Sequence, residues 1–437
     1  MTSPNYSQPE QKSWNAPTIK HALAGMVELP GSKSLTNREL VLSALAATPS
    51  QLIAPLESRD SQLMIQALSN LGAQITSAKQ KGNLEIMPAP SDMKVNTEIN
   101  CGLAGTVMRF VPPLAGLFQG EIRFDGDEAA RRRPMQTTID SLRKLGVEVI
   151  ADGNGLPFSI RSSGAIEGGE LEIDASASSQ FVSGLLLAAP RFTNGLRLKH
   201  TGRDLPSLPH IEMTLATLRN RGITANQTSE TSWEVQPGTI EGKQVVIEPD
   251  LSNAGPFMAA ALVLGGTVTI KNWPLDTTQV GKQFIPILTA MGAEIKRSES
   301  DLVVSGTGNI NGINIDMSEA GELAPVIVAL ATLANSESRI TGIGHLRGHE
   351  TDRLKALATE INKIGGNAIE LEDGIEISPT ATLHGGDWET YGDHRMATAA
   401  AIIGLAVPGI TVKNIEVVNK TMPEFVSLWN QMLGTSN

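Results

Sequence analysis

The chain of 437 residues lacks several features that mark large classes of protein. It contains a single cysteine, Cys101, so it can form no internal disulfide, and no cysteine–histidine cluster has the spacing of a zinc site. Aromatic residues make up only 4% of the chain, the formal net charge is −11, and there is no basic tract. Because nucleic-acid binders usually combine a basic patch with stacking rings, the composition argues against that class.

Two further absences bear on location and on cofactors. No apolar run reaches the ~20 residues that a membrane-spanning helix needs, and the polar start Met1 to Gln11 lacks the apolar segment of a signal peptide. We therefore expect a cytoplasmic protein without membrane association. Gly102 and Gly105 lack the rest of a dinucleotide fingerprint, and no serine–histidine–aspartate order stands out, so we expect neither a cofactor nor a metal.

What the chain does contain is a long repeat. An amphipathic helix that ends at a glycine occurs six times, and the glycines lie 69 to 76 residues apart. Glycine is common at helix ends because it adopts the left-handed cap without penalty, but a near-constant spacing of this length indicates repeated architecture. The glycines are Gly72, Gly146, Gly222, Gly292, Gly365 and Gly434.

Each repeat has a similar internal order. Five of the glycines precede a predicted hairpin, such as Ala293 to Val304 around the polar turn Ser298 to Ser300. The segments before the glycine helices are apolar on all sides, which is typical of buried helices. These segments are Leu103 to Phe118, Phe181 to Ala189, Pro256 to Leu264, Leu323 to Ala334 and Met396 to Val407. We therefore predict an α/β fold whose units contain a strand, a buried helix, a strand, an amphipathic helix and a hairpin, with the sheets outside.

Six such units exceed a usual single core, so we expect two lobes of three units each. The predicted boundaries give one lobe at 31–248 and a second at 1–30 plus 249–437, with crossings near Pro30 and Pro249. The last unit ends at Gly434 without a hairpin, whereas Trp14 to Leu29 offers strand material that no unit uses. We therefore expect the N-terminal segment to complete the last unit.

The segment Gly31 to Arg38 (GSKSLTNR) is the most informative single motif. It follows the strand-like run Met26 to Leu29 and leads into an apolar helix, so it places a lysine and an arginine beside the free N–H groups of a helix start. Helix starts bind anions, and Lys33 and Arg38 add cationic groups suited to phosphate or carboxylate. Ser34 or Thr36 is expected to cap this helix, Thr36 with Glu39 as a capping box. A capped helix with two solvated cations is the alternative.

Further cations stand beside the glycine, serine and threonine turns of the other units. Each alone is more often a surface charge, but together, in an acidic chain, they predict a polyanionic ligand between the lobes. They are Arg109, Arg133, Arg353, Arg395 and Lys420.

Three polar groups and three acid–base candidates accompany these cations. Ser178, Ser179 and Gln180 open a buried helix and fit phosphate binding, with ordinary capping as the alternative. Glu322, Glu350 and His394 are candidate proton shuttles near the cationic cleft. The alternatives are a helix-dipole carboxylate for Glu322, an i,i+3 ion pair for Glu350 and a structural histidine.

The motifs taken together resemble a known family. GSKSLTNR, AGTVMRF, RRRP, SSQF, HETDR, YGDHRM and NKTMPEF, from Gly31 to Phe425, occur in the order and spacing of the 5-enolpyruvylshikimate-3-phosphate synthase family. The resemblance implies a two-lobed, inside-out α/β barrel with three βαβαββ units in each lobe. It also implies transfer of the enolpyruvyl group of phosphoenolpyruvate to the 5-hydroxyl of shikimate 3-phosphate, with release of phosphate through a tetrahedral intermediate and without cofactor or metal.

The resemblance also implies residue roles. Shikimate 3-phosphate would be held by Lys33, Ser34, Arg38, Ser178, Ser179 and Ser207. Phosphoenolpyruvate would be held by Lys33, Gly105, Arg133, Gln180, Arg353, Arg395 and Lys420. Glu322, where the family commonly has aspartate, would take the proton from the attacking hydroxyl. Glu350 would protonate the methylene carbon, with His394 close by, and Gly105 would mark the glyphosate contact. Lys33 is a further catalytic candidate, and the assignment of acid and base among Glu322, Glu350, Lys33 and His394 stays open.

Three residues depart from the family pattern. Leu103 and His345 stand where asparagine is frequent, and His349 replaces the lysine that commonly precedes Glu-Thr-Asp-Arg. A histidine is only partly protonated near neutrality, so the substrate contact here is expected to depend on pH. Our hypothesis is that His349 still faces the substrates as a hydrogen-bond donor.

Two other functions remain open at this point. An enolpyruvyl transferase acting on UDP-N-acetylglucosamine would carry a lysine–asparagine turn and a catalytic loop cysteine, whereas this chain has Lys33-Ser34 and its cysteine precedes a buried helix. A non-catalytic repeat scaffold would not need cations and carboxylates at equivalent positions. We expect a monomer that acts on small molecules.

Overall fold

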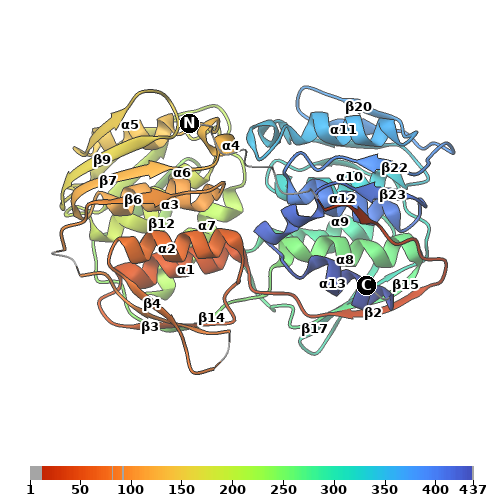
Figure 1. The fold of residues 1–437 in the computed structure, drawn as a ribbon, viewed down its shortest axis with the longest axis horizontal. Helices are drawn as coiled ribbons and strands as arrows, with labels where there is room; N and C mark the ends of the chain where they lie inside the picture. Colours follow the sequence, from red (N-terminus) through yellow and green to blue (C-terminus); the bar gives the residue numbers. More distant parts are fainter. Residues whose placement is uncertain (1–11, 81, 91–92, 436–437) are drawn as a thin grey trace, which may run out of the picture.

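The computed structural model describes residues 12–80, 82–90 and 93–435, so the polar segment Met1 to Gln11 lies outside the described residues. The described chain forms two α/β lobes side by side (Figure 1). One hydrophobic core contains residues from Leu40 to Ile240, and the other contains Ala16 to Leu29 together with Leu251 to Leu433. The prediction of a two-lobed α/β fold is confirmed.

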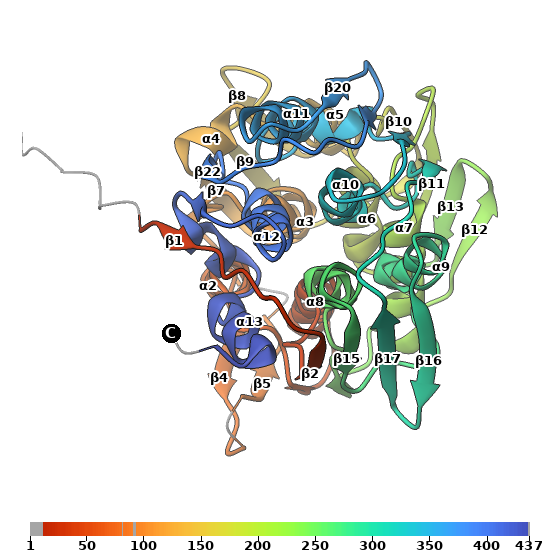
Figure 2. The ribbon, with the colours of Figure 1, turned by 90° about the vertical axis from the view of Figure 1, so that its right-hand side faces the viewer.

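Each lobe has three helices at its centre. They are α1 (Lys33–Leu45), α3 (Gly105–Ala115) and α6 (Gln180–Ala188) in the first lobe, and α8 (Leu251–Leu264), α10 (Ala324–Thr332) and α12 (His394–Gly404) in the second. Every residue of α10 and α12 is buried, and Figure 2 shows α8, α10 and α12 in the interior of their lobe. A helix without a polar face must be buried on all sides, which is why these sequences lie inside.

The sheets surround these helices. In the second unit, β6 (Thr97–Asn100) and β7 (Gln119–Asp125) are parallel, and β9 (Phe158–Ser163) and β8 (Glu148–Ala151) extend the sheet antiparallel. The inner helix is the crossover that a parallel strand pair requires. The same order occurs in the third unit, with β10 (Gly169–Ile173), β11 (Leu196–His200), β13 (Ser232–Val235) and β12 (Ala225–Ser229), and in the fifth, with β18 (Asn314–Asp316), β19 (Ser338–Thr341), β21 (Ile375–Ile377) and β20 (Ala368–Glu370).

Six amphipathic helices end at the repeated glycines, as predicted. They are α2 (Arg59–Asn70), α5 (Gln136–Lys144), α7 (Leu208–Asn220), α9 (Phe284–Ala290), α11 (Arg353–Lys363) and α13 (Phe425–Leu433). All six glycines have positive φ, between 67° and 108°, a conformation that costs other residues steric strain. The predicted hairpin is also present, because β16 (Glu294–Ser298) pairs with β17 (Asp301–Gly306) around Glu299 and Ser300.

The N-terminal segment does not join only the last unit, so that prediction was partly wrong. β1 (Trp14–Asn15) does join it, antiparallel to β23 (Ile410–Val412), which is parallel to β22 (Gly386–Trp388). However, β2 (Leu23–Val27) pairs in parallel with β15 (Gly266–Ile270) of the fourth unit. The fourth unit begins directly after a crossing between lobes, so no strand of its own precedes α8, and β2 fills that place.

The first unit shows the reciprocal exchange. β3 (Ser50–Ile53), β5 (Leu84–Met87) and β4 (Gln74–Ser77) are completed by β14 (Gln244–Val246), which is parallel to β3. The strand before Gly31, β2, therefore lies in a sheet of the second lobe, although the helix that follows it, α1, lies in the first lobe. In each lobe, one strand therefore comes from the segment just before the chain crosses to the other lobe: β14 in the first lobe and β2 in the second.

The two crossings between lobes lie side by side. Gly31 and Pro249 form an antiparallel bridge, the Ser32 N–H donates to the Glu248 carbonyl (2.8 Å), and the Asp250 N–H donates to the Pro30 carbonyl (2.8 Å). This pairing places the starts of α1 and α8 next to each other.

The cap of α1 differs from the prediction. The helix begins at Lys33 and its cap is Ser32, whose side chain accepts a hydrogen bond from the Leu35 N–H. Thr36 lies inside the helix, where its hydroxyl accepts from the Leu56 N–H (3.0 Å). The backbone is extended at Ser32 and helical after it, so neither Ser34 nor Thr36 can be the cap.

Candidate active site

A cavity of about 330 Å³ lies between the lobes, and its wall includes residues from five of the six inner helices and from the turn directly before the sixth, α10. Many of these wall residues come from the first turn of an inner helix or from the segment directly before it: Lys33, Ser34, Gly105, Thr106, Gln180, Ser252, Asn253, Glu322, His394 and Arg395. The N-terminus of a helix carries unpaired N–H groups and partial positive charge, so six of them around one cavity favour anions.

Most of the residues predicted from the sequence line this cavity, and they come from both lobes. They are Lys33, Ser34, Arg38, Gly105, Arg109, Arg133, Ser178 and Gln180 of the first lobe, and Glu322, His345, His349, Glu350, Arg353, His394, Arg395 and Lys420 of the second.

Two predicted residues do not line it. Ser179 is 4% exposed and caps α6 with its backbone, its carbonyl accepting from the Ser183 N–H. Ser207 has a left-handed backbone (φ 59°) before α7 and donates its N–H to the Ser318 carbonyl of the other lobe (3.3 Å). The direction of the Ser179 side chain depends on the rotation of α6 about its axis, and that of Ser207 depends on the turn before α7. A sequence pattern predicts neither direction.

Four guanidinium groups at the cavity have no carboxylate partner among the described residues: Arg38, Arg109, Arg133 and Arg395. Arg38, which is 2% exposed, instead donates to the Thr214 hydroxyl (2.8 Å) and to the His210 carbonyl (2.8 Å). Burial lowers the pKa of Arg38 to about 9, against the opposing influence of Glu322, so the group remains charged near neutrality. Buried charges without counter-ions are costly, and a bound polyanion would offset that cost.

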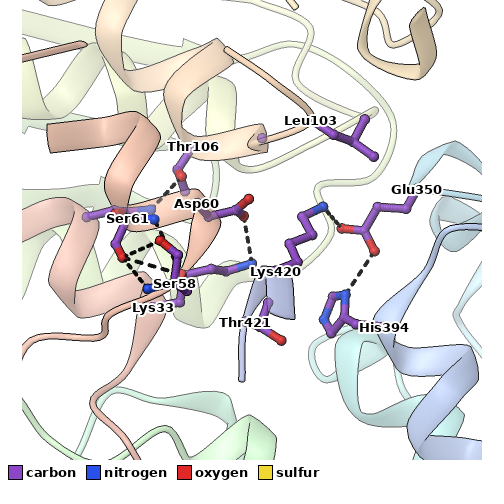
Figure 3. Close-up of polar contacts among 12 residues, drawn as sticks. Lys33, Ser58, Asp60, Ser61, Leu103, Thr106, Glu350, His394, Lys420 and Thr421 are labelled. Carbon is purple, nitrogen blue, oxygen red and sulfur yellow. Dashed lines mark hydrogen bonds and ion pairs between the residues drawn. The ribbon is translucent and has the colours of Figure 1, made fainter. Parts of the chain in front are cut away.

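Glu350 is the centre of an ion-pair network in the second lobe (Figure 3). Its carboxylate contacts the Lys420 ammonium and Nδ1 of His394 (3.2 Å), both drawn in Figure 3. It also contacts Nη2 of Arg353 (3.1 Å). Burial alone would raise the pKa of Glu350, but Lys420, His394 and Arg353 outweigh it and hold that pKa well below its ordinary value. Burial lowers the pKa of His394 to about 3, so its ring is neutral near pH 7.

Arg353 is fixed by a second carboxylate that the sequence analysis missed. Asp393 accepts from Nε (2.7 Å) and from Nη2 (3.1 Å) of Arg353 in a bidentate pair. Glu350, Asp393 and His394 bring possible metal-ligand atoms within 4.8 Å of one another. Because Arg353 and Lys420 already contact these carboxylates, the arrangement is that of an ion-pair network rather than a metal site.

Lys33 faces another acid that was not predicted. Its ammonium lies 3.5 Å from Asp60 of α2, which is 2% exposed (Figure 3). Asp250 was also missed: one carboxylate oxygen caps α8 through the Asn253 N–H (3.0 Å), and the other accepts the Lys33 N–H (3.0 Å). The place of Asp250 directly before the apolar helix α8 could have been recognised in the sequence as a helix cap. Nothing in the sequence indicates that Asp60 faces the cavity.

Glu322 is held by groups from two elements. The Ser252 hydroxyl donates to one carboxylate oxygen (2.5 Å), and Nε2 of His210 lies 3.2 Å from the other. Burial alone would raise the pKa of Glu322, but His210, Arg395 and Ser252 outweigh it and hold that pKa well below its ordinary value. An ionised carboxylate in this position can accept a proton.

His349 lines the cavity, but the expectation of partial protonation was wrong. Nη1 of Arg353 lies 3.3 Å from Nδ1 of His349, and since arginine can only donate, the proton of the neutral ring is on Nε2. Burial, Arg353, Arg133 and His345 hold the pKa of His349 well below its ordinary value, with Glu350 opposing. The ring is therefore neutral near pH 7.

Comparison with known proteins identifies the family. The family model for EPSP synthase (3-phosphoshikimate 1-carboxyvinyltransferase) matches residues 17–429. The chain belongs to the EPSP synthase family. A curated relative from Kocuria rhizophila, named 3-phosphoshikimate 1-carboxyvinyltransferase, is 52% identical over 447 aligned positions that cover 100% of both chains.

Solved EPSP synthases share the fold. Two structures from Acinetobacter baumannii superpose with TM-scores of 0.79 and 0.77, each at 24% identity over 97% of this chain and 98% of theirs. These neighbours confirm the predicted fold class. The family match also disfavours the two alternatives, the sugar-nucleotide transferase and the non-catalytic scaffold. In the described part of this EPSP synthase family chain, no helix is both long and apolar enough to cross a membrane.

The cysteine gives a first testable prediction. Cys101 is fully buried, and burial raises the pKa of its thiol to about 12 against the opposing influence of Arg109. Because the thiolate is the reactive form, we expect a thiol reagent at pH 8 to label the native protein at least ~1,000-fold more slowly than the urea-unfolded protein. Rapid labelling of the native protein with loss of activity would instead indicate a reactive cysteine, as the sugar-nucleotide enzyme requires.

Proposed function

We propose that the chain transfers the enolpyruvyl group of phosphoenolpyruvate to the 5-hydroxyl of shikimate 3-phosphate and releases phosphate. Its family makes it a transferase of the shikimate pathway, which supplies aromatic amino acids. The observation that carries the proposal is the interlobe cavity, in which cations from both lobes surround two ionised carboxylates. Two anionic substrates repel each other in water, and such a cavity offsets that repulsion.

The substrates are assigned to the two sides of the cavity. Shikimate 3-phosphate lies near Lys33, Ser34, Arg38 and Ser178, whereas phosphoenolpyruvate lies near Gly105, Arg133, Gln180, Arg353, Arg395 and Lys420. For Ser179 and Ser207, which lie outside the cavity wall, the proposal rests on the resemblance alone.

The reaction is an addition followed by an elimination. The 5-hydroxyl oxygen bonds to C2 of phosphoenolpyruvate, its proton leaves to a base, and the electron pair of the C2–C3 double bond takes up a proton at C3. The tetrahedral intermediate then loses a proton from C3 and breaks its C2–O bond to phosphate. Neither step changes an oxidation state, so the protein needs only to bind, orient and move protons.

The two carboxylates are suited to different proton transfers. Glu322 is ionised and held by two donors, and we assign it to accept the hydroxyl proton. Glu350, with His394 beside it, is assigned to the proton transfer at C3. Glu350 is ionised in the free cavity, but phosphoenolpyruvate bound to Arg353 and Lys420 would neutralise the cations that stabilise its charge and so raise its pKa toward that of a proton donor.

A direct assay tests the function. Purified protein should release inorganic phosphate when both shikimate 3-phosphate and phosphoenolpyruvate are present, and not with either alone. Release only with UDP-N-acetylglucosamine as the acceptor, or no release with any acceptor, would contradict the proposal.

We also infer a monomer that works in the cytoplasm. Both lobes of a single chain supply the cavity, so no second copy is needed to complete it. The single buried thiol is compatible with a reducing compartment.

Substitution of Gly105 tests where phosphoenolpyruvate and glyphosate bind. A methyl group at Gly105 would lie 2.9 Å from Oε1 of Gln180 and 3.2 Å from Nη1 of Arg133, closer than side chains normally approach. We therefore expect Gly105→Ala to raise the KM for phosphoenolpyruvate about tenfold and to weaken inhibition by glyphosate. Gly153→Ala is the control, since its methyl would meet nothing within 4 Å. Equal inhibition of wild type and Gly105→Ala would contradict this placement.

Substitution of His349 tests the proposed contact of its neutral ring. Loss of one neutral hydrogen bond is worth about 0.5–1.5 kcal/mol, so His349→Ala should raise the KM for one or both substrates about 2- to 10-fold. The increase should be constant from pH 7 to pH 9, because burial and the neighbouring Arg353 hold the pKa of the ring well below its ordinary value. Unchanged KM values would disprove the contact, and an increase that grows below pH 7 would show that the ring is protonated.

A further inference from the structure

His210 lies on the cavity wall, and neither a motif nor the resemblance assigns it a role. It stands near the start of α7 in the first lobe, and its Nε2 lies 3.2 Å from Oε2 of Glu322 in the second. Its position is fixed from behind, because its carbonyl accepts from Nη2 of Arg38 (2.8 Å) and from the Thr214 hydroxyl (3.0 Å). The ring therefore reaches across the cavity from a firmly held backbone.

The contact has a defined polarity. Glu322 is ionised and can only accept, so Nε2 of His210 carries the proton and donates it in the hydrogen bond. The Ser252 hydroxyl donates to the other oxygen, Oε1 (2.5 Å). The two oxygens of the Glu322 carboxylate are thus held by different lobes: His210 of the first lobe donates to Oε2, and Ser252 of the second lobe donates to Oε1. The two hydrogen bonds together fix the orientation of the carboxylate.

We propose that His210 is a positioning residue that holds Glu322, across the interlobe cavity, in the orientation in which it accepts the proton of the attacking hydroxyl. This inference rests on the proposed function. It also explains a departure in the chain itself: glutamate is longer by one methylene, ~1.5 Å, than the aspartate that the resemblance leads one to expect at position 322. The added length brings the carboxylate within reach of the imidazole.

Other charged groups also act on Glu322 and set the background for a pH test. Arg38 of α1, Arg353 of α11 and Arg395 of α12 favour its ionised form, whereas Asp250, before α8, opposes it. Of the ionisable groups, only His210 has a described hydrogen bond to the carboxylate. Removing this donor should therefore raise the pKa of Glu322 while the other charges stay in place.

The experiment compares His210→Phe with His210→Gln. Phenylalanine keeps a ring without a donor, whereas glutamine keeps an N–H group at a similar distance. We expect His210→Phe to lower kcat/KM with shikimate 3-phosphate and phosphoenolpyruvate about 10- to 100-fold and to move the acidic limb of its pH profile upward by about one unit. His210→Gln should recover most of the activity and the position of the limb. His384→Gln, at an exposed histidine outside the cavity, should match the wild type.

Two outcomes would overturn the inference. An acidic limb that stays in place in His210→Phe, whatever the loss of rate, would show that His210 does not act through Glu322. A rise in the KM for shikimate 3-phosphate alone would make His210 a simple substrate ligand.

A readout without substrates separates this inference from the proposed function. The ¹⁵N resonance of His210 Nε2 should shift in Glu322→Gln and in Glu322→Asp, and an unchanged resonance would refute the contact. Absence of phosphate release by the wild type would instead refute the function, whatever the resonance shows.

Discussion

Glu350→Gln is expected to lower kcat about 1,000-fold, in the middle of the range for loss of a general acid–base group. The amide cannot carry a proton to or from C3. It also removes the negative charge that orients Lys420 and Arg353, both of which contact the Glu350 carboxylate. The loss should therefore appear mainly in kcat, with a smaller rise in the KM for phosphoenolpyruvate. Steady-state phosphate release at saturating shikimate 3-phosphate measures both.

The matched control for this substitution is Glu416→Gln. Glu416 is an exposed glutamate four residues before Lys420, and its replacement should leave kcat within about twofold of the wild type. Retention of more than a tenth of the wild-type kcat in Glu350→Gln would contradict the assignment. The proton at C3 would then have to come from another group, and the ammonium groups of Lys33 and Lys420, which both line the cavity, are the next candidates.

The inner helices show what sequence alone can predict in this chain. The residues of α10, and almost all residues of α12 from Met396 onward, are apolar, so burial follows from composition without knowledge of any partner. The glycine ends were equally predictable, because the left-handed cap depends on the local backbone. Signals of this kind are local, and they fixed the unit order and the inside-out arrangement.

Strand partners were beyond this local information. β2 directly precedes α1 in the chain, yet it pairs with β15, and β14 takes the corresponding place beside β3. Strands such as Leu23–Val27 and Gln244–Val246 offer similar backbone N–H and C=O groups to any parallel neighbour, so their own sequences do not select the partner strand. The choice between lobes is made by the paired crossings at Gly31 and Pro249, which lie more than two hundred residues apart in the sequence.

The site residues divide in the same way, into those that local motifs predict and those that only tertiary packing reveals. Lys33, Arg353 and Arg395 were found because each stands in a motif at a helix start. Asp60 and His210 were missed, because each is a single ionisable residue on an amphipathic helix whose other charged residues are exposed: Arg59 on α2, and Glu212 and Arg219 on α7. Only the packing of α2 and α7 against the inner helices shows that these two side chains face the cavity.

Arg221→Met is expected to destabilise the protein by about 3–5 kcal/mol, the usual cost of leaving one partner of a buried ion pair alone. The Arg221 side chain is fully buried and donates to Glu39 of α1 (2.7 Å), to the Ser43 hydroxyl (2.8 Å) and to the Glu241 carbonyl (2.9 Å). It therefore joins the end of α7 to α1 and to the segment that leads back across the lobes. A urea titration followed by tryptophan fluorescence should show a markedly lower midpoint for the first lobe.

Two further variants make this stability test specific. Arg219→Met, two residues away, removes an exposed pair with Glu212 and should cost no more than about 1 kcal/mol. The double variant Arg221→Met with Glu39→Met should recover most of the lost stability, because an apolar pair leaves no buried charge without a partner. Equal midpoints for Arg221→Met and Arg219→Met would show that the buried pair does not hold α1 in place. The fixed position of Lys33, Ser34 and Arg38 on that helix would then have to come from the packing of its apolar residues alone.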